Sequence, residues 1–389
     1  MFLLRNCRLI PELTEGTGLT QADLLLDGEE IRAISPCGTP VEGEVEALDL
    51  QGATVMPGLI DMHTHLRMMG VGRTSDPLKP CLVTLDELRF AQYYLMNGYT
   101  TVRDVGDNIA NPAMALRDQI NGGLLQGPRI FCSGPTLAPT EKGFDSAYST
   151  PHHFEVDSAA EMRQKVRYNL QKGSDFIKLY GSGSLCVPSG QPGALIMEPD
   201  EIQEAVHMAA RKNTYCAIHM HGSEGCHLAA ELGVRTIEHA SFILPETLKY
   251  LEGLKSKGHG IVPTVSVLLD DSWGKVPDDA YGNVVSHLRR AKEYDVLIGW
   301  GTDTSLGFYE KRPYAEFQLR KEELGFSNLE ILQQITINSA VLMMKDHLIG
   351  TVKAGKLADL IVLPDNPVED LTVLYHRPLH VIKGGQLIY

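Results

Sequence analysis

The sequence predicts an α/β protein: a (β/α)8 barrel of the TIM type with a small β-sandwich domain formed by its N- and C-terminal segments. A length of 389 residues suits one large barrel plus a small accessory domain. The middle of the chain alternates short apolar strands with amphipathic helical stretches, which is typical of βα units and a parallel sheet. Both ends consist of brief apolar runs broken by glycine, proline and acidic residues.

The two ends share a β-like texture. The N-terminal segment contains LLRNCRLI, ADLLLDGEEIRAIS and EVEALDLQGATVMPG, and the C-terminal segment contains GTVKAGKLADLIVL and HVIKGGQLIY. Because the termini of a domain often lie close together, we expect these segments to pair. The predicted boundaries are 1–56 and 350–389 for the β-sandwich domain, and 57–349 for the barrel.

Eight candidate barrel strands follow one another between these ends. In order they are TVMPGLIDMHTH, YTTVRDVG, RIFCSG, DFIKLYGSG, YCAIHMHG, TIEHA, GIVPTVSV and VLIGWGTDTS. Helix-like sequence alternates with them, for example LDELRFAQYYLMNG after the first strand. In such a barrel the functional residues lie at the C-terminal ends of the strands, so metal-competent side chains are expected directly after the apolar runs.

Composition narrows the class of partner. The formal net charge of -14 argues against binding to nucleic acid or to an anionic membrane surface, and no apolar run is long enough to span a bilayer. Seven cysteines without a C-x-x-C pair argue against a disulfide framework and favour a reducing, cytoplasmic location. The apolar start reads as a first strand rather than a signal peptide. We expect a homo-oligomer that acts on a small-molecule substrate.

The first histidine pair ends the first predicted barrel strand. His63 and His65 follow the apolar run VMPGLIDM, and their i, i+2 spacing puts both imidazoles on one face of a strand. Two neutral ring nitrogens that converge on one point make a good zinc half-site. The alternative is a surface pair of histidines in a loop, which the preceding strand disfavours.

Lys178 lies inside the fourth predicted strand. Alternation puts Phe176, Lys178 and Tyr180 on one face, and one of the two faces is turned to the barrel interior. A buried lysine loses its proton easily, and the neutral amine can add carbon dioxide to give an anionic carbamate. Such a group can bridge two metal ions about 3.5–4 Å apart. The alternative is a lysine whose ammonium reaches to solvent.

Three later strand ends carry further candidates. His219 and His221 share a face of the fifth strand, so alternation alone leaves open which of them binds a metal. His239 follows the run TIE, and Asp303 lies between small residues in WGTDTS. The alternatives are hydrogen-bonded interior histidines and an aspartate that caps the next helix.

These motifs, in this order, resemble the amidohydrolase superfamily. The resemblance rests on GLIDMHTHL, the mid-chain lysine strand, HMHG, IEHAS, GTDTS and the tail INSAVLMMKDHLIGTVKAGKLADLIVL, and it covers the whole chain. Within the superfamily, GSDFIKLYGSG and AIHMHGSEGCHLAAELGVRTIEHASF are similar to the branch of metal-dependent dipeptidases and carboxypeptidases called prolidases, which borders the imidazolonepropionases.

The resemblance implies a binuclear centre with two divalent ions, expected to be zinc. His63 and His65 would bind the more buried ion together with Asp303, and His219 and His239 the more exposed one. Lys178, as N6-carboxylysine, would bridge the two ions.

The expected activity is hydrolysis of amide C–N bonds in dipeptides or N-acyl amino acids. A metal-bridging hydroxide would attack the carbonyl, with Asp303 as general base and acid. Candidate substrate contacts are Tyr180, His152, His153 and His221. The alternatives are a cyclic amide hydrolase or imidazolonepropionase-like enzyme, an aminohydrolase (deaminase) and, least favoured because no predicted ligand is missing, a non-catalytic scaffold.

Overall fold

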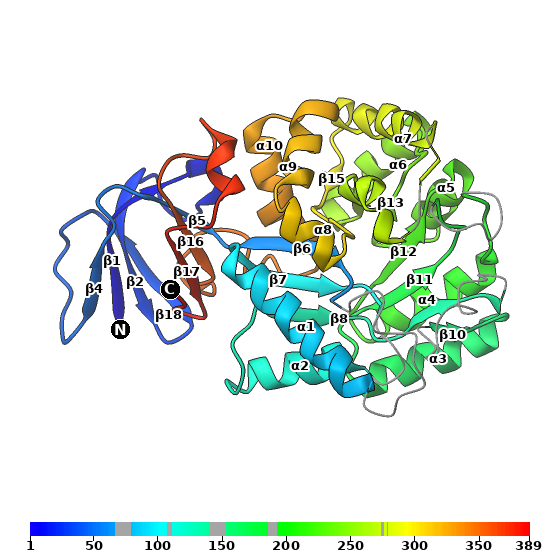
Figure 1. The fold of residues 1–389 in the computed structure, drawn as a ribbon, viewed down its shortest axis with the longest axis horizontal. Helices are drawn as coiled ribbons and strands as arrows, with labels where there is room; N and C mark the ends of the chain where they lie inside the picture. Colours follow the sequence, from blue (N-terminus) through cyan, green and yellow to red (C-terminus); the bar gives the residue numbers. More distant parts are fainter. Residues whose placement is uncertain (67–78, 107–110, 141–152, 186–192, 274–275, 278) are drawn as a thin grey trace. The chain divides into compact units, whose positions relative to one another are not determined.

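A computed structural model describes residues 1–66, 79–106, 111–140, 153–185, 193–273, 276–277 and 279–389 (Figure 1). The described chain divides into two compact units, one of residues 1–60, 92–101 and 327–389 and the other of residues 61–91 and 102–326. The predicted domain boundaries at 56/57 and 349/350 stay a prediction. Within the described ranges, no helix is both long enough and apolar enough to cross a membrane.

The first unit contains one eight-stranded sheet built from both ends of the chain. Its order is β18-β17-β16-β5-β1-β2-β3, with β4 beside β1. The strands are β1 (Phe2–Leu9), β2 (Gln21–Asp27), β3 (Glu30–Ser35), β4 (Glu46–Asp49), β5 (Thr54–Pro57), β16 (Leu360–Leu363), β17 (His380–Lys383) and β18 (Gln386–Leu387). Pairing of β5 with β16 confirms that the two terminal segments join.

This sheet encloses a single core. Leu4 and Leu24 from the N-terminal strands and Leu360 and Ile382 from the C-terminal strands are buried in the same cluster. Strands β1 and β3 each contain both buried and exposed residues, as expected for a sheet with one face turned to a core. The chain at residues 29–31 also hydrogen-bonds residues 356–358 just before β16, so the sheet curls on itself.

All eight predicted barrel strands are present. They are β6 (Leu59–Thr64), β7 (Tyr99–Asp104), β8 (Arg129–Cys132), β11 (Ile177–Tyr180), β12 (Cys216–Met220), β13 (Thr236–His239), β14 (Gly260–Val262) and β15 (Leu297–Ile298). Two additional short strands, β9 (Thr136–Ala138) and β10 (His153–Glu155), precede β11 in the chain and extend the sheet beside it.

Backbone hydrogen bonds join these strands into a closed ring. Strands β11 to β15 pair in parallel in sequence order, and β6, β7 and β8 form a second sheet. The amide of Met62 donates to the Trp300 carbonyl over 2.8 Å, and that of Asp175 donates to the Cys132 carbonyl over 2.8 Å. The first bond joins β15 to β6 and the second joins β8 to β11, which confirms the predicted (β/α)8 barrel.

Helices alternate with the barrel strands. In chain order the helices are α1 (Lys79–Met96), α2 (Pro112–Asn121), α3 (Ala159–Lys172), α4 (Pro199–Ala210), α5 (Ser223–Glu231), α6 (Pro245–Leu254), α7 (Ala280–Arg289), α8 (Leu306–Lys311), α9 (Ala315–Gln318), α10 (Asn328–Gln333) and α11 (Ser339–Leu342). Figure 1 shows α3 to α7 outside the strands. Local sequence sets their ends: Ser158 caps α3 by accepting from the Glu161 amide, and Gly173 ends it with a φ of +102°.

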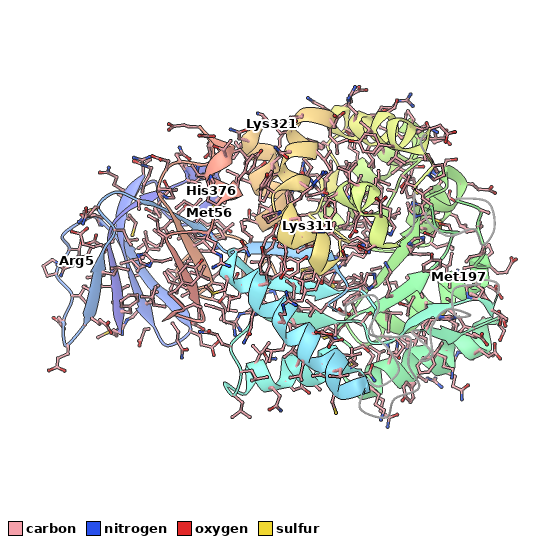
Figure 2. All side chains as sticks on the ribbon, viewed as in Figure 1. Arg5, Met56, Met197, Lys311, Lys321 and His376 are labelled. Carbon is pink, nitrogen blue, oxygen red and sulfur yellow. The ribbon has the colours of Figure 1, made fainter. Side chains whose placement is uncertain are left out.

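Buried side chains pack inside the barrel. Figure 2 draws the described side chains as sticks on the ribbon. Phe176, Tyr215 and Ala217 form a buried cluster, and the guanidinium carbon of Arg103 lies 5.1 Å from the centre of the Phe176 ring. The face of β11 that carries Phe176 is therefore turned inward, and Lys178, two residues on, lies on the same face. This packed layer forms the floor beneath the polar residues at the strand ends.

Candidate metal centre

The end of β6 presents two imidazoles with defined orientation. The Nδ1 atom of His63 lies 2.7 Å from Oε2 of Glu238, and that of His65 lies 3.1 Å from the carbonyl oxygen of Gly106. A carboxylate and a carbonyl accept hydrogen bonds, so the ring proton of each histidine belongs on Nδ1. Nε2 of both rings then keeps a lone pair that is available to a metal ion.

Asp303 lies beside these two rings. Its amide donates to the carbonyl of His63 over 2.8 Å, which ties the end of the eighth strand to the first. One carboxylate oxygen lies 3.5 Å from Nε2 of His65 and 3.8 Å from Nε2 of His63. His63, His65 and Asp303 thus form a group whose ligand atoms lie within 4.8 Å of one another, a spacing that suits one metal ion.

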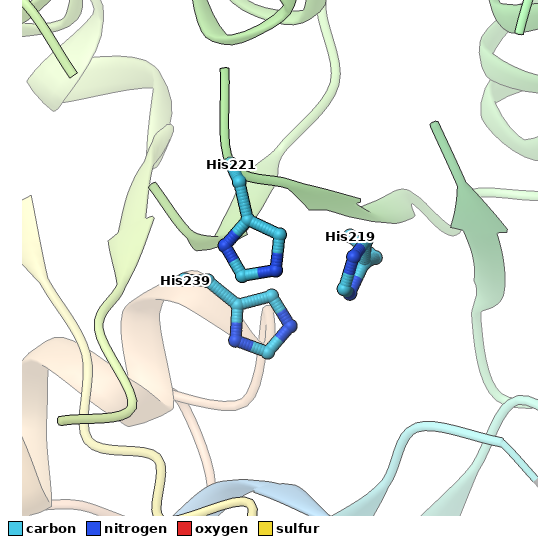
Figure 3. A group of neighbouring side chains, drawn as sticks. All are labelled: His219, His221 and His239. Atoms are coloured by element: carbon cyan, nitrogen blue, oxygen red, sulfur yellow. The ribbon is translucent and has the colours of Figure 1, made fainter. Parts of the chain in front are cut away.

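A second group consists of His219, His221 and His239, again with ligand atoms within 4.8 Å of one another (Figure 3). Nδ1 of His221 lies 2.7 Å from the Ser241 hydroxyl, and Nδ1 of His239 lies 2.7 Å from the Thr264 hydroxyl. The two groups adjoin, because the ring centres of His63 and His239 are 4.7 Å apart.

Two buried nitrogen atoms in this region lack a hydrogen-bond partner among the described residues: Nζ of Lys178 and Nε2 of His219. An unsatisfied buried polar atom is costly, so such atoms mark places where a ligand completes the site. Burial lowers the pKa of Lys178, while the charges of Glu238 and Asp303 oppose that shift. The residues present therefore fit a metal centre.

Electrostatics favours neutral imidazoles here. Burial is the largest cause lowering the pKa of His63, His219 and His239, and it lowers that of His221 to about 3. The charge of Lys178 contributes to the shift at all four rings, so it acts on both groups. Burial raises the pKa of Asp303, with Lys178 acting in the opposite direction. Neutral rings carry the lone pairs that metal binding requires.

The candidate substrate residues fall in different places. Tyr180, at the end of β11, stacks on His219 with ring centres 4.0 Å apart and an interplanar angle of 8°. His221 lies within the second ligand group rather than apart from it. His153 is buried at the start of β10 opposite Thr136, and neither ligand group contains it. His152 lies outside the described residues.

Two functional candidates escaped the sequence reasoning, Arg103 and Glu238. Both are fully buried, and Nη2 of Arg103 lies 2.7 Å from Oε1 of Glu238. A signal was present in the sequence, because a charged residue inside a short barrel strand is unusual unless it is paired.

Comparisons with known proteins agree with this architecture. The sequence profile described as the amidohydrolase family matches residues 54–388. Ochratoxinase from Aspergillus niger is 30% identical over 379 residues, covering 86% of this chain and 75% of that protein. A probable imidazolonepropionase from Nematostella vectensis is 24% identical over 385 residues, covering 88% of this chain and 82% of that protein.

A solved structure extends the likeness to the whole chain. A prolidase complexed with N-methylphosphonate-L-proline superposes with a TM-score of 0.84 at 28% identity, covering 100% of this chain and 99% of that one. The profile match spans most of the sequence, including every strand end described above. The chain belongs to the amidohydrolase family.

Proposed function

We propose that this protein is a metal-dependent hydrolase of amide C–N bonds that acts on dipeptides or N-acyl amino acids. The observation that carries the proposal is the pair of adjoining ligand groups at the strand ends, together with two buried nitrogen atoms, Nζ of Lys178 and Nε2 of His219, that have no hydrogen-bond partner among the described residues. The similarity to a prolidase and to ochratoxinase supports the amide class.

The proposed ligand set follows the two groups. His63, His65 and Asp303 would hold one ion, and His219 and His239 would hold a second. Lys178 would bridge them after its neutral amine adds carbon dioxide and releases a proton, leaving an N-carboxylate. Imidazole and carboxylate donors of this kind suit zinc. His221 stays a proposed substrate contact, with its ring held by Ser241.

Two bound divalent ions would polarise the scissile carbonyl and make water acidic near neutral pH. Asp303 would accept a proton from the attacking water and deliver it to the nitrogen of the leaving amine. One carboxylate oxygen of Asp303 lies 3.5 Å from Nε2 of His65, which supports a role for Asp303 beside the proposed ligands. The products are a carboxylate and a free amine, so each turnover consumes one water.

A substrate screen tests the activity. Protein produced with bicarbonate and zinc would be incubated with dipeptides and N-acyl amino acids, and the released amino acid measured by liquid chromatography. Cyclic amides and aminated heterocycles would be screened in parallel as alternative substrates, because a probable imidazolonepropionase is among the relatives. Turnover of the linear amides is expected. Turnover confined to the alternative substrates would replace the proposed substrate class.

Metal content tests the binuclear centre separately. We expect about two zinc ions per chain, since five side-chain ligands and an aspartate exceed what one tetrahedral ion uses. A fully active protein with a single ion per chain would contradict this arrangement.

The expected cytoplasmic location and homo-oligomeric state also stay predictions. Light scattering coupled to size-exclusion chromatography would test the oligomeric state.

A further inference from the structure

Glu238 is a fully buried carboxylate that connects the ligand histidines to the barrel floor. Its Oε2 lies 2.7 Å from Nδ1 of His63. Its Oε1 accepts two hydrogen bonds, from Nη2 of Arg103 over 2.7 Å and from the Thr236 hydroxyl over 2.5 Å. The two carboxylate oxygens therefore have different partners: His63 at Oε2, and Arg103 and Thr236 at Oε1.

Several contacts hold the Arg103 side chain in place. Its Nε donates to the Met62 carbonyl over 2.5 Å, and its Nη1 donates to the Thr236 hydroxyl over 3.1 Å. The guanidinium also lies over the Phe176 ring. A guanidinium has donors only, and the Thr236 hydroxyl uses its proton on Glu238 after accepting from Arg103. The atom at the Oε1 position must therefore be an acceptor.

We propose that Glu238 is a positioning residue that sets the tautomer of His63. Its carboxylate accepts the Nδ1–H of His63, which leaves the Nε2 lone pair turned toward the ligand group. Arg103 and Thr236 hold the carboxylate in place, and the guanidinium of Arg103 balances its negative charge. This role rests on the proposed function, because it takes His63 to be a metal ligand. Glu238 itself belongs to neither ligand group.

The substitution Glu238→Gln tests this relation with almost no change in size. Arg103 and Thr236 require the amide oxygen at Oε1, so the amide NH2 group must face Nδ1 of His63. Nδ1 then becomes the acceptor, and the ring proton moves to Nε2. A ring protonated on Nε2 has no lone pair for the ion.

The first measurement uses metal-free protein labelled with 15N-histidine, at a pH where the ring is neutral. Long-range 1H–15N spectra report which ring nitrogen carries the proton, and the His63 signal is the one lost in His63→Asn. We expect His63 protonated on Nδ1 in the wild type and on Nε2 in Glu238→Gln. This readout requires neither bound metal nor turnover.

The second measurement is zinc affinity by competition with a chelator. We expect affinity about 10–100-fold weaker in Glu238→Gln, the usual cost of losing a partner of a ligating histidine. Glu316→Gln is the matched control, because Glu316 is also buried and paired with an arginine, 2.7 Å from Nε of Arg320. That variant is expected to lose stability while the tautomer and the zinc affinity stay unchanged.

Wild-type His63 protonated on Nε2 would overturn the inference without any variant, even if Glu238→Gln failed to fold. A folded Glu238→Gln that keeps Nδ1–H, or that binds zinc as tightly as Glu316→Gln, would overturn it as well. The failure of the proposed function is distinguishable, since a wild type that binds no zinc contradicts the metal centre itself. The tautomer in metal-free protein decides the role of Glu238 by itself.

Discussion

Left-handed backbone occurs at two of the proposed ligands. His239 and Asp303 have φ values of +67° and +53°, and Ala240 follows His239 with +50°. This conformation costs a residue with a Cβ about 1–2 kcal/mol. The neighbours impose it: the Ala240 amide donates to the Met220 carbonyl, and the Asp303 amide donates to that of His63. Such strain concentrates at functional sites because the surrounding structure over-determines it.

Lys178→Ala should abolish most activity and lower the zinc content. Removing the side chain removes the bridge proposed between the two ligand groups. Short carboxylic acids added to the variant should restore part of the activity, because a free carboxylate can take the place of the carbamate. Zinc content and kcat would be measured on the same sample, with exposed Lys212→Ala as the control. Normal metal content and turnover in Lys178→Ala would make the lysine structural.

Asp303→Asn should separate proton transfer from metal binding. Asparagine keeps the size and a possible ligand oxygen but is no base, so kcat should fall by about 10²–10⁴-fold. The exposed Asp365→Asn serves as the control, and zinc is quantified in every sample. His63→Ala, by contrast, should lose metal together with activity. If Asp303→Asn kept both its metal and a near-normal kcat, the proton shuttle would have to be another group, with His221 the next candidate.

The buried histidines predict acid sensitivity of the metal-free protein. The fold holds the pKa of His63, His219, His221 and His239 below the ordinary value of 6.5. The unfolded chain therefore binds more protons below pH 6.5, so the stability present above that pH is lost as the pH falls. The raised pKa of Asp303 acts in the opposite sense, so a variant is needed to isolate one histidine.

His221→Asn provides that comparison. Each neutral buried histidine steepens the fall in stability by up to about 1.4 kcal/mol per pH unit below 6.5. Urea unfolding of the metal-free protein would be measured at several pH values between 7 and 5. The slope of the free energy of unfolding against pH should be smaller in the variant, by up to the contribution of one proton. An identical slope in the wild type and His221→Asn would mean that His221 is protonated in the folded state.

At the scale of elements, the junction between β15 and β6 sets the spacing of the first ligand group. The Met62 amide bonds the Trp300 carbonyl, and Asp61 accepts from both the amide and the hydroxyl of Thr302. Gly301 lies between Trp300 and Thr302 in the chain, and a Cβ added to it would lie 2.7 Å from the Cβ of His63. Gly301 does not have a positive φ, so its backbone conformation does not require a glycine. The close packing against His63 does.

Gly301→Ala should displace His63 and weaken zinc binding. A Cβ closer than 3.0 Å to another carbon requires the strands to separate, and such overpacking typically costs about 1–3 kcal/mol. Gly307→Ala is the matched control, because a Cβ there meets nothing within 4 Å. Urea unfolding and zinc competition would be measured for both variants. Equal behaviour of the two would contradict the tight junction.

At the scale of the whole chain, the two termini share one hydrophobic core. Ile382, on β17, is fully buried with Leu4 of β1. Ile382→Ala should therefore lower the free energy of unfolding by about 2–5 kcal/mol. Leu387→Ala, at an exposed position on β18, should change it by less than about 0.5 kcal/mol. Similar losses in both variants, measured by urea unfolding, would contradict a shared core.

The sequence alone determined the order of the strands and the positions at which polar residues end them. Apolar runs report burial directly, and the period-2 pattern distinguishes strands from helices, so the eight barrel strands and the β-like ends were predictable. Local pattern also placed His63, His65, Lys178, His219 and Asp303 at or near strand ends. Their assignment as metal ligands stays a proposal, because a pattern contains no distance between strands.

Tertiary structure decided what each of those side chains meets. Alternation in β13 turns Thr236 and Glu238 inward, so an extended His239 would point away from the site, and only its left-handed backbone brings the ring beside His63. The hydrogen bond between His63 and Glu238 joins residues 175 positions apart. Closure of the barrel creates such contacts, because it brings the ends of all eight strands together whatever their separation along the chain.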